Sequence, residues 1–199
     1  MENIYITSDI HYSHKNIVGG ITKWRNEQGE IPSDRVRNFE TLEDMNYALV
    51  DNINKVVGEN DILYFLGDLT LSNNGAKSND EFIEQIKCKN KYLILGNHDM
   101  MIRKYRDYFL SDGKFKLIAE NYCLKIGDKI IYLTHKLNTY LRLLNENEYH
   151  LHGHSHHRGE IRFTGNRSMD IGIDGNENFE PYKLIDVLNL VDKQYIKNK

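Results

Sequence analysis

The sequence has few of the residues that mark disulfide-rich, fibrous or disordered proteins. Its 199 residues include only two cysteines and two prolines, against 14 glycines, which excludes a collagen-like or disordered chain. Cys88 and Cys123 show no C-x-x-C spacing, which indicates a reducing compartment or a protein indifferent to redox. A chain of this length can bury a core that folds without disulfides.

Long hydrophobic runs and an excess of basic charge are missing as well. No apolar run approaches the roughly 18 residues of a membrane span, and the first five residues lack the basic and apolar regions of a signal peptide. The net charge of −3 argues against a protein that coats duplex DNA or an anionic membrane, since both need a basic surface. We therefore expect a cytoplasmic protein, and the length predicts a single domain over residues 1–199.

Hydrophobic periodicity predicts strands and helices that alternate early in the chain and a β-rich second half. Strands are expected at 3–9, 62–66, 92–95, 115–119, 122–126, 129–134, 149–151 and 169–173, with a hairpin turn at Gly127-Asp128. Helices are expected at 39–57, with Thr41 and Gly58 as caps, and at 80–88, 100–110 and 182–196. Residues 19–38 and 72–79 are predicted to be loops. This order predicts an α/β or α+β fold with two sheets.

What the sequence does have is histidine, gathered in short clusters. The nine are His11, His14, His98, His135, His150, His152, His154, His156 and His157. Most of them fall in five segments, each at the carboxyl end of a predicted strand, where open α/β sheets concentrate their binding residues. The segments are Asp9-Ile10-His11, Gly67-Asp68, Gly96-Asn97-His98-Asp99, Thr134-His135 and Gly153-His154-Ser155-His156.

The side chains in these segments are oxygen and nitrogen donors. The candidate ligands are Asp9, His11, Asp68, Asn97, His135, His154 and His156. This donor set suits Mn²⁺, Fe or Zn²⁺, and seven ligands are too many for one tetrahedral zinc ion. They would serve two metals about 3.5–4 Å apart if one carboxylate bridges, an arrangement suited to displacement at phosphorus. Gly67, Gly96 and Gly153 each precede a ligand, where a residue without Cβ permits close approach.

The five segments resemble, in order, the D-x-H, G-D, G-N-H-[DE], lone His and G-H-x-H blocks of the calcineurin-like metallophosphoesterases. Residues 9–17 also look like the start of a compact single-domain subgroup found in bacteria and phage. The resemblance implies a four-layer αββα sandwich of two mixed sheets flanked by helices. It further implies a phosphoric ester hydrolase with two divalent metals, Mn²⁺ first, with Fe, Zn²⁺ or Ni²⁺ as alternatives.

The resemblance also implies a role for each ligand. Asp9, His11, Asp68 and His156 would hold the first metal, and Asp68 would bridge to a second metal held by Asn97, His135 and His154. A metal-bridging hydroxide would attack phosphorus, and His98 would protonate the leaving oxygen.

Two positions depart from the family pattern. Leu71 stands where many members have the last aspartate of G-D-x-x-D, so Asp99 or a main-chain carbonyl would have to orient His98. Thr134 stands where a glycine often precedes the lone histidine.

Several other residues have both a functional and a structural interpretation. His14 and Arg158 are candidate substrate contacts, although a surface salt bridge explains Arg158 equally well. Trp24, Arg25, Arg35 and Arg37 make the loop 19–38 a candidate substrate lid or nucleic-acid contact, against the simpler interpretation of a solvated loop. His150, His152 and His157 match no family ligand, and we expect them to be partly buried or exposed.

The sequence thus predicts a binuclear metal-dependent phosphoesterase that hydrolyses phosphomonoesters or phosphodiesters. One alternative is a nuclease or cyclic-nucleotide phosphodiesterase on the same site. Another is a catalytically silent binding module on the phosphoesterase fold. The expected partners are a phosphorylated small molecule or short nucleotide, without membrane or extended duplex nucleic acid.

Overall fold

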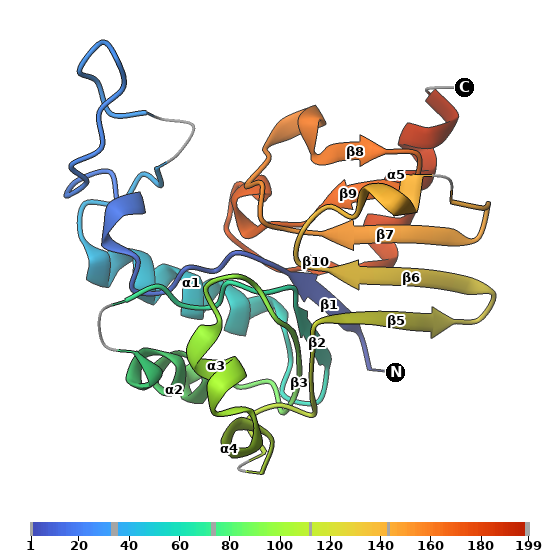
Figure 1. Cartoon of the computed structure of the whole chain (residues 1–199), viewed down its shortest axis with the longest axis horizontal. Helices are drawn as coiled ribbons and strands as arrows, with labels where there is room; N and C mark the ends of the chain where they lie inside the picture. Colours follow the sequence, from blue (N-terminus) through green and yellow to red (C-terminus); the bar gives the residue numbers. More distant parts are fainter. Residues whose placement is uncertain (1, 33–35, 73–74, 112, 143, 198–199) are drawn as a thin grey trace.

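The computed structural model of the chain describes residues 2–32, 36–72, 75–111, 113–142 and 144–197 (Figure 1). Two five-stranded sheets pack against each other, and helices lie against them. Both sheets contain parallel and antiparallel pairs. Two mixed sheets with flanking helices confirm the expected fold class.

The first sheet has the order β10-β1-β2-β3-β4. Its strands are β1 (Ile4–Thr7), β2 (Ile62–Phe65), β3 (Asn90–Ile94), β4 (Leu117–Ala119) and β10 (Tyr182–Lys183). The strands β1 to β4 are parallel to their neighbours, and only β10 runs antiparallel, along β1. The carboxyl ends of β1, β2 and β3 therefore meet at one edge.

The second sheet has the order β5-β6-β7-β9-β8. Its strands are β5 (Asn121–Ile126), β6 (Lys129–Thr134), β7 (Glu148–His152), β8 (Phe163–Gly165) and β9 (Ser168–Asp170). The predicted turn at Gly127-Asp128 joins β5 to β6, and Ile126 pairs with Lys129 across it. Because β6 and β7 are parallel, their carboxyl ends also lie together.

Two apolar clusters hold these layers. One joins the first sheet to α1 (Leu42–Val56), α2 (Ala76–Gln85), α3 (Met100–Lys104) and α4 (Arg106–Ser111). The other lies between the sheets and includes the buried face of α5 (Leu184–Lys197). Short 3₁₀ turns occur at Lys15–Ile17, Thr139–Arg142, Gly159–Arg162 and Ile173–Gly175. Among the described helices, none has the length and hydrophobicity to cross a bilayer.

The helix boundaries differ from the predictions where polar residues are buried by tertiary contacts. The helix expected at 80–88 begins at Ala76, inside the predicted loop. Ser78 and Asn79 are buried on it, and Asn79 Oδ1 accepts a hydrogen bond from Thr70 Oγ1. These polar side chains are typical of a loop, but in the helix a hydrogen bond from Thr70 compensates for the burial of Asn79.

Four further boundaries or caps are corrected. The helix expected at 100–110 is broken at Tyr105, whose backbone leaves the helical region. Thr41 caps α1 as predicted, but Gly58 provides no left-handed cap; its N–H donates to Asp61 Oδ2 instead. The last helix begins at Leu184 because the two residues before it pair with β1. The strand expected at 169–173 is β9, which ends at Asp170.

The core packing gives a direct stability prediction. Leu49 in α1 is fully buried, whereas Tyr47 on the same helix is 72% exposed. Leu49→Ala should lower the free energy of unfolding by about 2–5 kcal/mol, and Tyr47→Ala should change it by less than about 0.5 kcal/mol. Urea unfolding of both variants measures this. Equal losses of unfolding free energy would show that the buried face of α1 does not contribute to the core.

Candidate metal centre

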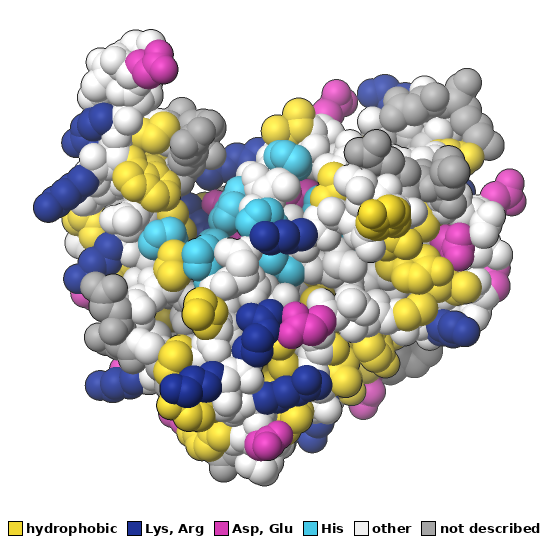
Figure 2. Space-filling view, in the orientation of Figure 1, with side chains coloured by type: hydrophobic (Ala, Val, Ile, Leu, Met, Phe, Trp, Pro, Cys, Tyr) yellow, Lys and Arg dark blue, Asp and Glu magenta, His cyan; other side chains and the backbone are white. Residues whose placement is uncertain are grey.

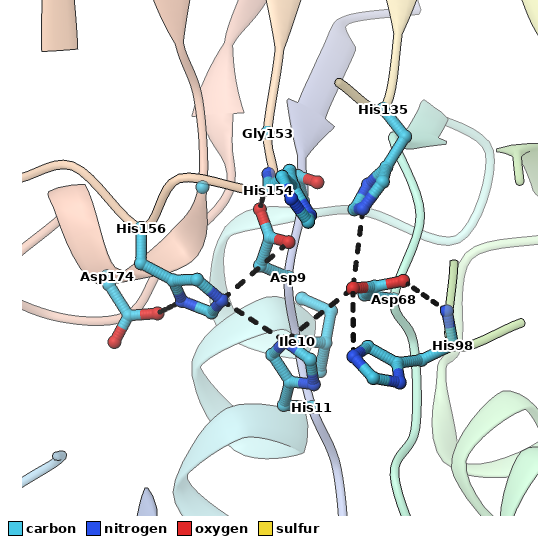
Figure 3. A network of polar contacts seen from close by, with 12 residues as sticks. Asp9, Ile10, His11, Asp68, His98, His135, Gly153, His154, His156 and Asp174 are labelled. Atoms are coloured by element: carbon cyan, nitrogen blue, oxygen red, sulfur yellow. Dashed lines mark hydrogen bonds and ion pairs between the residues drawn. The ribbon is translucent and has the colours of Figure 1, made fainter. Parts of the chain in front are cut away.

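The loops that follow β1, β2, β3, β6 and β7 converge where the carboxyl ends of the two sheets meet (Figure 3). Two groups of donors form there. The first is Asp9, His11 and His156, and the second is Asp68, His135 and His154; within each group the ligand atoms lie within 4.8 Å of one another. Asn97 joins the second group, since its Oδ1 lies 3.1 Å from His135 Nε2. All seven predicted ligands are therefore brought together, although their metal-binding role stays a prediction.

The first group has the spacing of ligands around a common ion. His11 Nε2 and His156 Nε2 lie 3.2 Å apart, and two nitrogens that each bind an ion at about 2.1 Å would lie about 3.4 Å apart in tetrahedral geometry. Asp9 Oδ1 lies 3.9 Å from His156 Nε2 and has no hydrogen-bond partner in the described part of the chain. Burial raises the pKa of the Asp9 carboxyl to about 7. A cation would supply the missing compensation.

The second group is centred on one oxygen of Asp68. Asp68 Oδ2 lies 3.3 Å from His135 Nε2 and 3.9 Å from both His11 Nε2 and His98 Nε2. This oxygen therefore reaches toward both donor groups, as a bridging ligand must. Burial works to raise the pKa of Asp68, but hydrogen bonding to His135 and the charge of that ring outweigh it and lower the pKa to about 2.

Backbone groups fix which atoms face the centre. The N–H of His154 donates to Asp9 Oδ2, and the N–H of His98 donates to Asp68 Oδ1, each at 2.8 Å. One oxygen of each carboxylate is thus held while the other points inward. His135 Nδ1 donates to the Leu66 carbonyl at 2.7 Å, which leaves its Nε2 toward Asp68. Such a partner sets the ring orientation and tautomer of a metal-binding histidine.

The ligand loops are locally strained. Five of the predicted ligands have positive φ, namely Asp9, His11, Asp68, His154 and His156, at values of 51° to 71°. This region is uncommon for residues other than glycine, and each such residue costs on the order of 1–3 kcal/mol when the structure holds it there. Packing in the two apolar clusters must offset that cost if the donor atoms are to stay close to one another.

Two of the glycines confirm the expected close approach. A Cβ on Gly96 would lie 2.1 Å from Asp68 Oδ1, and one on Gly153 would lie 2.0 Å from Ser8 Oγ and 2.4 Å from Asp9 Oδ2. These contacts are closer than non-bonded atoms permit. The loops can therefore pack onto the two carboxylates only if these positions lack a side chain.

Asp174, which no sequence pattern singled out, supports the first donor group from behind. Its Oδ2 accepts a hydrogen bond from His156 Nδ1 at 2.8 Å, and Arg37 donates to both of its oxygens at 2.8 and 2.9 Å. Burial opposes ionisation of Asp174, but the charge and hydrogen bonds of Arg37 outweigh it and hold the pKa well below its usual range. Asp174 follows the strand β9, so its place after a predicted strand was the available signal.

Arg37 is an exception to the interpretation of residues 19–38 as a solvated loop, in which residues 23–31 are exposed. Its side chain is 1% exposed and also donates to the carbonyls of Asp9 and Ile10, at 2.7 and 2.6 Å. It therefore fastens the end of this loop beneath the first donor group. Arg25 folds back onto the carbonyls of Thr22 and Trp24, and Arg35 lies outside the described residues.

The expectation that Asp99 or a main-chain carbonyl orients His98 is not met in the described part of the chain. The buried Asp99 carboxylate accepts backbone hydrogen bonds from Gly96, Asp68 and Leu69 at 2.8 to 3.0 Å, so it ties the loops after β2 and β3 together. The His98 side chain is 40% exposed, and its ring packs edge-on against the His11 ring with the two centroids 5.6 Å apart. In the described ranges no side chain or carbonyl forms a hydrogen bond with its ring.

His150 and His152 are also corrected, because both are fully buried. His150 bonds Thr134 and Ser168, and His152 bonds Thr164. Burial lowers the pKa of His150 to about 3. The two rings are buried, hydrogen-bonded groups of the second sheet, whereas the His157 side chain is one third exposed.

An open cavity of about 410 Å³ lies over both donor groups. His98, His14, Trp24 and Arg158 line it together with ligand residues. Figure 2 shows histidines gathered in the hollow between the segment 19–38, which projects beside α1, and the second sheet. Burial lowers the pKa of His14 to about 4, so its ring is neutral at neutral pH. His14 and Arg158 thus line the cavity in which substrate contacts are predicted, and that role stays a prediction. Arg158 also forms the salt bridge that was its alternative, with Asp174 at 3.4 Å.

The chain is similar to known proteins over most of its length. The model of the family "Calcineurin-like phosphoesterase" matches residues 2–187. The "Uncharacterized protein MJ1445" of Methanocaldococcus jannaschii is 32% identical over 197 residues, covering 97% of this chain and 93% of that protein. The "Gene 66 protein" of Mycobacterium phage L5 is 25% identical over 199 residues, covering 87% of each.

One solved structure shares the fold. It is a protein of unknown function, AQ665 from Aquifex aeolicus, with a TM-score of 0.64 and 22% sequence identity. The alignment covers 96% of this chain and 100% of that one. At this identity the likeness supports the fold alone.

The contact between Asp174 and His156 predicts a loss of metal affinity on substitution. Asp174→Asn keeps an acceptor for His156 but removes the charge that polarises its ring, so the affinity for Mn²⁺ should fall about 10–100-fold. Calorimetric titration of metal-stripped protein measures this. Glu177→Gln, which removes an exposed charge nearby, is the matched control. If both variants bind Mn²⁺ like the unmodified protein, Asp174 does not support the site.

Proposed function

This chain belongs to the calcineurin-like phosphoesterase family, and from that membership we propose that it is a metal-dependent hydrolase of phosphomonoesters or phosphodiesters. The observation that carries the proposal is the pair of neighbouring donor groups, with Asp68 Oδ2 of the second group 3.9 Å from His11 Nε2 of the first. Their donors are carboxylate oxygens, an amide oxygen and imidazole nitrogens, which fit two divalent cations such as Mn²⁺. When bound, such a pair stabilises charge on a phosphoryl group and lowers the pKa of water from 15.7 to about 7.

The charge around the site supports an anionic substrate. Two divalent cations bring +4 and the carboxylates Asp9 and Asp68 bring −2, which leaves +2. Asp174 adds no net negative charge, because Arg37 pairs with it. A phosphate would therefore be attracted locally although the whole chain carries a net charge of −3.

His98 is the proposed general acid. Its partly exposed ring faces the cavity, and its Nε2 lies 3.9 Å from Asp68 Oδ2. An imidazole there can reach the oxygen that leaves from a phosphate held over the two donor groups. General acid catalysis of this kind is typically worth about 10²–10⁴-fold in rate.

A catalytically silent binding module on the same fold is the alternative from another class. Such a module would be expected to lack ligands or the acid, yet all seven ligand positions and His98 are filled here. A nuclease or cyclic-nucleotide phosphodiesterase would use the same residues. Short or single-stranded substrates fit the acidic chain better than extended duplexes do, because duplexes need a basic track.

Removing a shared or terminal ligand should abolish metal binding and activity together. Metal-stripped Asp68→Ala and His154→Ala should bind less than the two equivalents of Mn²⁺ proposed for the unmodified protein, and should lose turnover on chromogenic monoesters and diesters. Reloading with Mn²⁺, Ni²⁺, Fe²⁺ or Zn²⁺ before assay identifies the active metal. Asp51→Ala, which removes a carboxylate on the outer surface of α1, is the control. Undetectable turnover of the unmodified protein with every metal and ester would support the binding module.

His98→Ala should separate catalysis from metal binding. The backbone N–H of residue 98 remains, so it still anchors Asp68 Oδ1, and two equivalents of Mn²⁺ should bind. Turnover should fall by about 10²–10⁴-fold, measured as kcat on the same esters. Unchanged kcat would show that His98 is not the acid.

A further inference from the structure

The chain has a single tryptophan, and it lines the cavity over the donor groups. Trp24 and Ile17 line that cavity together with His98, Asp68 and Arg158. The cavity is therefore apolar and aromatic in one part and charged in another. An amphipathic ligand, with a phosphate and a flat apolar ring, matches both parts.

Trp24 is held in place by contacts at the base of the segment 19–38. The buried Thr22 hydroxyl donates to the Asn16 carbonyl at 2.7 Å and accepts from the Trp24 N–H at 3.2 Å. The Thr22 N–H in turn bonds the Val18 carbonyl. The backbone at Trp24 is thus fastened to the 3₁₀ turn that follows the first ligand loop, and the indole lines the cavity from this position.

Neighbouring rings lead from the first donor group to the indole. The His14 ring lies 5.2 Å from the ring of the predicted ligand His11 and 6.2 Å from that of Trp24, which meets it edge-on. The His14 ring therefore neighbours both a predicted ligand and the indole. The candidate acid His98 opens onto the same cavity, so a leaving group protonated by His98 could extend toward Trp24.

We propose that Trp24, whose ring meets that of His14 edge-on, is a stacking site for a nucleobase in the leaving group of a nucleotide ester whose phosphate lies over the two donor groups. This inference rests on the proposed function and specifies its substrate class. Stacking tolerates any base, since every base has a π-face. The site therefore selects nucleotides from other phosphate esters without selecting one base.

The single tryptophan makes the test direct. Two inert ligands are titrated into Zn²⁺-loaded protein: a nucleoside phosphonate, whose carbon–phosphorus bond resists hydrolysis, and methylphosphonate, which lacks the base. The nucleoside phosphonate should quench the fluorescence of Trp24, and methylphosphonate should leave it unchanged. Quenching by both ligands, or by neither, would contradict stacking on the indole.

Affinities of variants measured by calorimetry complete the test. Trp24→Ala should weaken binding of the nucleoside phosphonate about 5- to 150-fold, the range expected for one stacked base, and should not change that of methylphosphonate. Trp24→Phe should restore most of the lost affinity. Tyr140→Ala is the matched control, because Tyr140 is 95% exposed and lines a different groove, beside Asn97 and His135.

Failure of this inference differs from failure of the proposed function. If Tyr140→Ala rather than Trp24→Ala weakens binding of the nucleoside phosphonate, the base binds in the other groove and the inference is wrong. If Trp24→Ala weakens binding of both ligands equally, the residue has only a structural role. Both results leave hydrolysis intact, whereas an unmodified protein that hydrolyses no ester with any metal overturns the proposed function while the binding data still stand.

Discussion

Two carboxylates, Asp9 and Asp68, are held away from water where the two sheets meet, and the rest of the site depends on this. Buried charges must be paired or bound to metal. A backbone N–H satisfies one oxygen of each, and the other oxygen faces imidazoles. The buried cation beneath them, Arg37, binds Asp174 and backbone carbonyls instead. The protein thus concentrates negative charge and nitrogen donors at one point, which divalent cations would neutralise.

The architecture explains how distant segments reach that point. Each parallel strand ends at the same edge of its sheet, so short loops suffice to bring donors from the two sheets together. The loops are strained, with positive φ at five of the donor residues. Glycines at 96 and 153 let them pack onto the carboxylates. Two apolar clusters hold the strands that carry these loops, so stability is provided away from the site.

The sequence predicted what depends on local pattern. Strand ends followed by Asp, Asn or His predicted that seven side chains gather, and the structure brings them together where the two sheets meet. The apolar face predicted for α1 lies in the core. It could not reveal the partners that only the fold brings together. The pattern around Arg37 predicts an exposed side chain in a loop, because its partner Asp174 lies 137 positions later in the sequence. Likewise Asp99 looked free to orient His98, but three backbone N–H groups already occupy its carboxylate.

Anomalous diffraction from crystals of manganese-loaded protein tests the central claim most directly. Two peaks about 3.5–4 Å apart are expected in the cleft, one beside Asp9, His11 and His156 and the other beside His135 and His154, with the Asp68 carboxylate between them. A single peak, or two peaks of which only one contacts Asp68, would contradict the shared carboxylate from which the proposed chemistry follows.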